Sequence, residues 1–117
     1  MAADYAISVR FGDPILEHGF TTVPTLFLEH YADLGMTTNE AMFVIQLFSF
    51  WWGISCPYPR LNTVAKRMGC SWRQCHCYAA SLQDKGLLLI SHRFDGHGKQ
   101  VSSEYDFTPL LRMLQGC

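Results

Sequence analysis

Two short amphipathic segments joined by a glycine turn constrain this fold more than any other feature of the sequence. Apolar residues recur at helical spacing over residues 60–68, which predicts a short helix. Gly69 and Cys70 are expected to form a tight turn, and Ser71 is a good N-cap for a second helix that extends to Lys85. Two packed helices joined by so sharp a turn are typical of a helix-turn-helix.

A β-hairpin is expected directly after the second helix. Residues 87–93 form one predicted strand, residues 94–99 contain two glycines that predict a turn, and residues 101–107 alternate as a returning strand. This order of elements is that of a winged helix-turn-helix. We therefore expect a mostly α (α+β) fold with a three-helix core, a recognition helix at about 71–85 and a hairpin wing at about 94–100.

The segments before this unit are expected to form an arm and an extra N-terminal helix. Residues 7–11 alternate between apolar and polar types, which predicts a short strand within an arm spanning residues 1–22. Pro24 occupies a first helical turn, and Gly35 closes the extra helix. The winged-helix domain is therefore expected to span residues 23–117.

Two further helices complete the predicted core. Thr37 and Glu40 have the spacing of a capping box, and the helix that they open, about residues 39–52, is apolar on nearly every face. Thr108 and Pro109 open a last short helix. A helix that is apolar all round lies at the centre of a core or contacts a second molecule.

The charge is divided unevenly between the two halves of the chain. Residues 1–56 carry one base and six acids, whereas residues 57–117 carry eight bases and four acids, so the net charge of −1 conceals a basic C-terminal half. A phosphate backbone responds to such local charge. The longest nearly apolar run, residues 41–52, is too short to span a membrane. The five cysteines are an odd number and no secretory signal is visible, so free thiols and a cytoplasmic location are expected.

Residues 64–76, continued by residues 82–87, resemble the helix-turn-helix of bacterial gluconate-operon-repressor-type regulators. The upstream segments 20–24 and 34–40 are more similar to the N-terminal winged helix of plasmid and phage replication initiators and primosome loaders. Both resemblances imply a DNA-binding winged helix. They also imply that the start of the second helix faces DNA while Cys75, Ala79 and Leu82 belong to the core.

Basic and polar residues on three elements are candidates for DNA contact. Arg73 and Gln74 begin the second helix, where arginine can pair with guanine and glutamine with adenine. Bases on the preceding helix and on the wing are expected to contact phosphates, although each is also an ordinary surface charge. For Trp72 the favoured alternative is a ring folded over the hairpin as additional core. The predicted DNA-binding residues are Arg60, Lys66, Arg67, Ser71, Trp72, Arg73, Gln74, His76, Cys77, Arg93, His97 and Lys99.

The cysteines of the second helix invite a metal or redox hypothesis. Cys75 and Cys77 point to opposite sides of a helix, so a tetrahedral site within one chain is not expected. A redox-sensitive Cys77, one turn from Arg73, and a metal site between subunits stay open. Neighbouring Cys75 and His76 diverge around the helix and cannot act as nucleophile and base. With no catalytic motif visible, we expect no enzyme, no metal and no cofactor.

The aromatic side chains of residues 48–52 exceed what one small domain can cover, which predicts a homodimer. The predicted interface comprises Phe48, Trp51, Trp52, Leu110 and Leu114. The leading interpretation is a sequence-specific transcriptional regulator that inserts its second helix into the major groove of double-stranded DNA. Two alternatives stay open: a replication initiator or primosome-type module with a replication or transcription protein as partner, and a winged helix used only for protein contacts.

Overall fold

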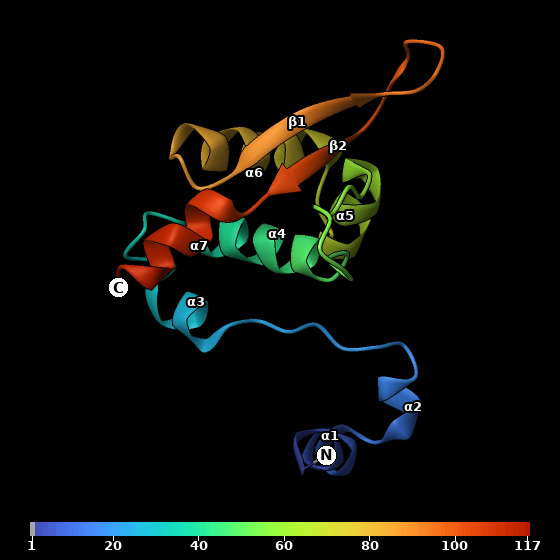
Figure 1. Cartoon of the computed structure of the whole chain (residues 1–117), viewed down its shortest axis with the longest axis vertical. Coiled ribbons are helices and arrows are strands. Elements are labelled where there is room, and N and C mark those ends of the chain that lie inside the picture. The colour runs from blue at the N-terminus through green and yellow to red at the C-terminus, as the bar shows by residue number, and fades with distance from the viewer. Residues whose placement is uncertain (1) are drawn as a thin grey trace.

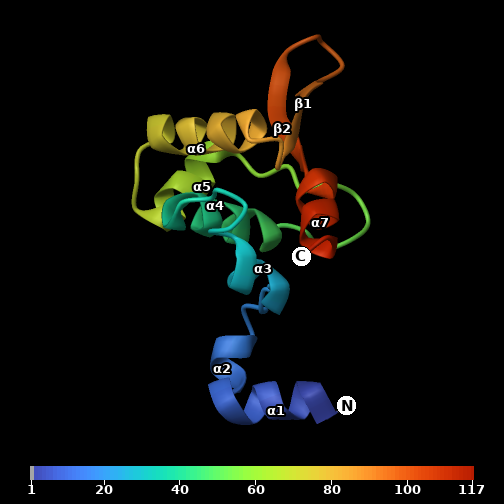
Figure 2. The same ribbon diagram turned by 90° about the vertical axis from the view of Figure 1, so that its left-hand side faces the viewer.

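A computed structural model describes residues 2–117, with side chains from residue 6 onward. A helical body carries a projecting hairpin at one end and an extended N-terminal arm at the other (Figures 1 and 2). The predicted fold class is confirmed. The elements in chain order are α1 (Ala2–Phe11), α2 (Asp13–Leu16), α3 (Thr25–His30), α4 (Thr38–Phe48), α5 (Leu61–Met68), α6 (Trp72–Asp84), β1 (Leu89–Phe94), β2 (Gln100–Asp106) and α7 (Thr108–Gln115).

The N-terminal arm is helical, so the prediction of a strand at residues 7–11 is wrong. Among residues 2–117 the strands are β1 and β2, which pair with each other and lie far from the arm (Figure 1). An isolated strand leaves its backbone groups unpaired, whereas a helix closes its hydrogen bonds locally. Residues 13–16 form a further helical turn, after Gly12 takes a positive φ of 81°.

The helix-turn-helix forms as the sequence predicts. Gly69 adopts the left-handed conformation, with φ 69° and ψ 31°, and ends α5. The Cys70 amide then donates to the Ala65 carbonyl at 3.0 Å, which closes the turn. Ser71 and Gln74 form a reciprocal capping box at the start of α6, which fixes the direction in which that helix leaves the turn.

The hairpin is an antiparallel pair in which Ile90 lies opposite Tyr105, with an irregularity between Ser91 and Arg93. Its turn is held by Asp95, whose carboxylate accepts the backbone amides of His97 and Lys99. The hairpin extends beyond the helical body and stands beside α6 (Figure 2).

One hydrophobic core joins α3, α4, α5, α6, the base of the hairpin and α7. Leu87 and Leu88 enter this core just before β1. The fully buried large side chains are Phe27, Phe43, Val44, Leu47, Val64, Cys75, Leu82, Leu87, Leu88, Phe107 and Leu110. The central helix α4 ends at Phe48, four residues before the predicted end.

The predicted dimer face lies mainly inside this chain. Phe48, Leu110 and Leu114 are buried in the core, where the Phe48 ring packs on that of Phe107 at a centroid distance of 4.8 Å. Trp51 is half-buried against the same two rings, and Trp52 alone is strongly exposed, at 77%. Phe48, Leu110 and Leu114 cannot contact a partner, because α7 packs on the end of α4. The sequence analysis expected this end of α4 to be exposed.

Candidate nucleic-acid interface

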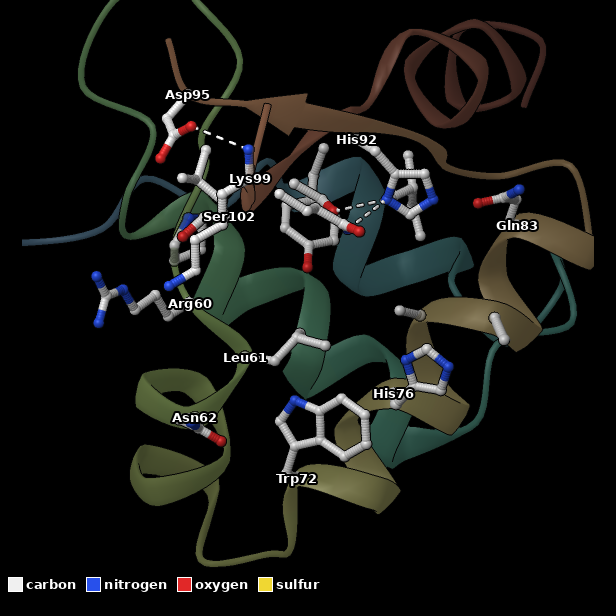
Figure 3. A pocket seen from close by; sticks show the side chains of 18 of the residues that line it. Arg60, Leu61, Asn62, Trp72, His76, Gln83, His92, Asp95, Lys99 and Ser102 are labelled. Carbon is white, nitrogen blue, oxygen red and sulfur yellow. Dashed lines mark hydrogen bonds between the residues drawn. The ribbon is translucent and has the colours of Figure 1, made fainter. Parts of the chain in front are cut away.

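A groove of about 840 Å³ separates α6 from the hairpin. Its walls come from the start of α5, one face of α6 and residues of both strands (Figure 3). Two alanines, Ala79 and Ala80, lie between the larger side chains of the α6 wall. This wall consists of Trp72, His76, Ala79, Ala80, Gln83 and Asp84.

Two stacked aromatic rings lie at one end of the groove. Trp72 and His76 lie one turn apart on α6, with ring centroids 5.1 Å apart and planes inclined by 12°. Trp72 remains 52% exposed, so the interpretation of this ring as additional core over the hairpin is wrong. An exposed, rotationally restrained indole is a surface on which a nucleobase can stack.

Two cations line the same groove. Arg60 immediately precedes α5, and Lys99 comes from the hairpin turn (Figure 3). Neither forms an ion pair among the residues that the structure describes. Asp95 and Asp84 also line the groove, but one oxygen of Asp95 already accepts two backbone amides. The charged lining therefore comprises two bases and two acids, and Arg60 and Lys99 are the cations that form no ion pair among the described residues.

Two of the predicted phosphate-binding arginines are held elsewhere. The Arg67 guanidinium lies 4.4 Å from the centre of the Phe50 ring, and its Nη1 donates to the Ser49 hydroxyl at 3.1 Å. The Arg93 guanidinium lies 4.1 Å from the centre of the Tyr58 ring. Arg93 also lies 3.7 Å from Glu104, so both arginines stabilise the fold and lie outside the groove.

Other predicted DNA contacts spread over different faces. Arg73 and Cys77 are exposed on α6 but do not line the groove, and the same is true of Lys66 on α5 and of His97 at the hairpin tip. The sequence therefore identified four residues that the structure brings together. They are Arg60, Trp72, His76 and Lys99.

Ser71 and Gln74, both predicted to contact DNA, form the capping box of α6; the sequence predicted this capping role for Ser71 but not for Gln74. The backbone amide of Gln74 donates to the Ser71 hydroxyl at 3.1 Å, and the side-chain oxygen of Gln74 accepts the backbone amide of Ser71 at 3.0 Å. An adenine needs both ends of the glutamine amide group. Gln74 can pair with a base in this way only if the cap of α6 opens.

The groove also contains residues that the sequence analysis missed. His92 on β1 lines it, and its Nδ1 lies 3.0 Å from Nε2 of Gln100 and 3.3 Å from Oγ of Ser103 on β2. His92 lies two residues after Ile90, which also lines the groove, so both side chains are on the same face of β1.

Metal-ligand clusters and membrane-spanning helices are both absent from the described residues. They contain no group of three or more histidine, cysteine, aspartate or glutamate side chains placed to hold a metal ion. They also contain no helix that is both long and apolar enough to cross a membrane.

A helix-turn-helix with a two-stranded hairpin beside its second helix defines a winged helix, and this chain has that fold. Residues 23–116 match the family described as the DnaD N-terminal domain, so the chain belongs to that family. The chain is similar to the crystal structure of the N-terminal domain of DnaD protein from Geobacillus kaustophilus HTA426. That match has a TM-score of 0.68 and 27% identity, and it covers 88% of this chain and 83% of the other. No curated protein sequence matches the chain.

The family match distinguishes between the functional interpretations. It favours the replication initiator or primosome-type module over the gluconate-operon-repressor type of transcriptional regulator, which no comparison supports. The resemblance of segments 20–24 and 34–40 was therefore the more informative of the two for function.

Proposed function

We propose that this chain is a DNA-binding winged-helix module of a replication or primosome-type protein, and that DNA lies in the groove between α6 and the hairpin. One observation carries the proposal: the exposed Trp72–His76 stack shares a groove with Arg60 and Lys99, and neither cation forms an ion pair with an acidic side chain that the structure describes. Membership of the DnaD N-terminal domain family supports the replication role.

The groove suits a DNA strand for two physical reasons. Arg60 and Lys99 approach it from α5 and from the hairpin, so both can contact phosphates of one backbone. Trp72 supplies a π-face that accepts any base or a sugar edge. Phosphate contacts position a protein on DNA without reading sequence.

Weak sequence preference follows from the start of α6. Its capping box uses the side chain of Gln74, and Arg73 does not line the groove. Neither side chain is therefore placed to read base edges of DNA in the groove, as a full recognition helix does. Binding through contacts to DNA phosphates and through base stacking agrees better with a replication module than with an operator-specific regulator.

The test is a titration of labelled double-stranded DNA, followed by fluorescence anisotropy at low salt, where electrostatic binding is strongest. Replacing both Arg60 and Lys99 by alanine should weaken binding at least tenfold, because two phosphate contacts are lost. Arg112→Ala is the matched control, since Arg112 is an exposed cation on α7 outside the groove. Equal weakening by the control, or no wild-type binding at low salt, would refute this site.

Self-association through the N-terminal arm is a second candidate function, and we propose that the chain forms a homodimer. The arm projects from the body and exposes Val9, Phe11, Ile15 and Phe20, each by more than half (Figure 1). An apolar surface of this kind is typical of an interaction site. Replacing Phe11 and Ile15 by serine should lower the mass measured by sedimentation equilibrium to that of a monomer, while a serine at exposed Met113 on α7 should not.

We also propose that the protein acts in the cytoplasm, by binding and without catalysis. All five cysteines are free thiols, which supports a reducing compartment. Fractionation of cells that produce the tagged protein tests the location.

A further inference from the structure

Two thiols meet at the turn of the helix-turn-helix. The Sγ atoms of Cys70 and Cys75 lie 3.6 Å apart. Cys70 is the residue before the N-cap Ser71, and Cys75 is the fourth residue of α6. These are the two positions of a hydrophobic staple, whose side chains pack together and fix how the chain enters a helix. Here both staple residues are cysteines.

The contact is selective among the thiols of the chain. Cys77 is only two residues from Cys75 but is exposed on another face of α6, and Cys117 donates to the Met113 carbonyl. Within the described residues, Cys70 and Cys75 form the thiol–thiol contact. A disulfide needs a separation of about 2.0 Å, so side-chain rotation at the turn must bring the two sulfurs roughly 1.5 Å closer.

The two thiols differ in their access to a reagent. Cys75 is fully buried, whereas Cys70 is partly exposed at the turn. Burial, together with the hydrogen bond to Cys70, raises the pKa of the Cys75 thiol to about 12. Cys75 therefore stays protonated, and Cys70 is the thiol that an oxidant meets first.

We propose that Cys70 and Cys75 are a modification site, at which a peroxide converts the staple into a reversible disulfide. The Cys70 thiolate attacks one peroxide oxygen, the O–O bond breaks, and the released hydroxide takes up a proton to give water. Cys70 is then a sulfenic acid. The Cys75 sulfur attacks the Cys70 sulfur, the S–O bond breaks, and the hydroxyl leaves with the Cys75 proton as a second water. Two thiols are oxidised and one peroxide is reduced.

The disulfide encloses the start of α6. The ring that it closes contains Ser71 and Gln74, which form the capping box, and Trp72 and Arg73 between them. A covalent staple therefore holds the first turn of the helix against the end of α5. The inference rests on the thiol geometry and is independent of DNA binding.

The experiment uses the whole chain and hydrogen peroxide. Oxidised protein is unfolded, its free thiols are blocked with iodoacetamide, and it is digested with trypsin without reductant. Trypsin cuts after Arg67, Arg73 and Lys85, so it opens the ring and separates the two cysteines. A disulfide links peptide 68–73 to peptide 74–85, with a mass two hydrogen atoms below the sum of the reduced peptides. A dithiol should restore both peptides.

Cys77→Ser is the decisive variant, because Cys77 shares peptide 74–85 with Cys75 and is exposed, so its replacement leaves the fold intact. The linked peptide should persist in Cys77→Ser and vanish in Cys75→Ala. In Cys75→Ala a sulfenic acid trapped at Cys70 by dimedone would support the order of steps. Absence of the link in folded Cys77→Ser, under conditions that oxidise Cys117, would overturn the proposal. Oxidation of Cys70 to a sulfinic acid without the link would do the same.

Discussion

The ammonium group of Lys85 lies 2.6 Å from the carboxylate of Glu40, which is almost completely buried. Lys85 follows α6, and Glu40 belongs to the first turn of α4, so the pair joins two helices whose ends are 45 residues apart in the sequence. The Lys85 ammonium also donates to the Gly35 carbonyl at 2.7 Å. One side chain thus fixes the end of the helix beside the groove to the start of the central helix.

Lys85→Met should destabilise the protein by about 2–4 kcal/mol, since removal of one partner leaves the Glu40 carboxylate buried without its counter-ion. The value is set below that of a fully buried pair because the Lys85 side chain is 32% exposed. Urea unfolding followed by circular dichroism measures the change. Lys66→Met is the control: Lys66 is an exposed, unpaired cation of the described structure, and its loss should cost less than about 0.5 kcal/mol.

Stability should fall as the pH is lowered below the ordinary glutamate pKa of 4.5. Burial alone would raise the pKa of Glu40, but hydrogen bonds from Lys85, Ser81 and the Thr37 amide, with the Lys85 charge, outweigh it and lower that pKa. A carboxyl group with a lowered folded-state pKa stabilises the protein above its unfolded pKa, and this stabilisation is lost as pH falls through the folded pKa. The urea midpoint measured from pH 7 to pH 3 should decline less steeply in Glu40→Gln than in wild type. Parallel declines would show that Glu40 does not carry the effect.

Gly69→Ala should cost about 1–2 kcal/mol, because Gly69 ends α5 in the left-handed conformation, which a Cβ atom disfavours. A Cβ at this position meets no atom within 4 Å, so the cost comes from backbone conformation and not from a clash. Gly53 gives the matched comparison. Its Cβ would also be unobstructed and its φ is not positive, so Gly53→Ala should leave the thermal midpoint almost unchanged.

Local signals in the sequence predicted the helix-turn-helix and the hairpin almost to the residue. Gly69 at the turn, Ser71 at the N-cap and the glycines of the hairpin turn each act within a few residues of the chain. The same holds for the capping box of Thr37 and Glu40, which begins α4 as expected. These features could be read from the sequence because their physical causes are local.

Long-range features could not be read in the same way. The alternation at residues 7–11 gave no information on whether a partner strand exists, and the arm formed a helix instead. The apolar residues of α4 gave no sign that α7 covers them. Gln74 has the residue type for reading adenine, yet its side chain caps α6. His92 lies on the same strand face as Ile90, but that face lines a groove only because the hairpin stands beside α6, which no local pattern predicts.

Trp72→Ala should weaken DNA binding by about fivefold to 150-fold, the loss expected when one base–aromatic stacking contact is removed. Trp72→Phe should recover part of the affinity, because phenylalanine keeps a stacking face. Trp52→Ala is the control, since Trp52 is a strongly exposed indole outside the groove. DNA should also quench the fluorescence of wild type more than that of Trp72→Phe. Equal quenching in both proteins would place the bound DNA elsewhere.

Lys99→Ala should lower the slope of log affinity against log salt by about one, as the loss of one phosphate contact requires. The effect should be the same on unrelated DNA sequences, because a phosphate contact reads no base. Arg67→Ala should leave the slope unchanged, since the Arg67 guanidinium rests on Phe50 and bonds to Ser49. Isotherms at four or more salt concentrations measure both slopes. A lowered slope in Arg67→Ala with none in Lys99→Ala would move the DNA from the groove to the opposite side of α5.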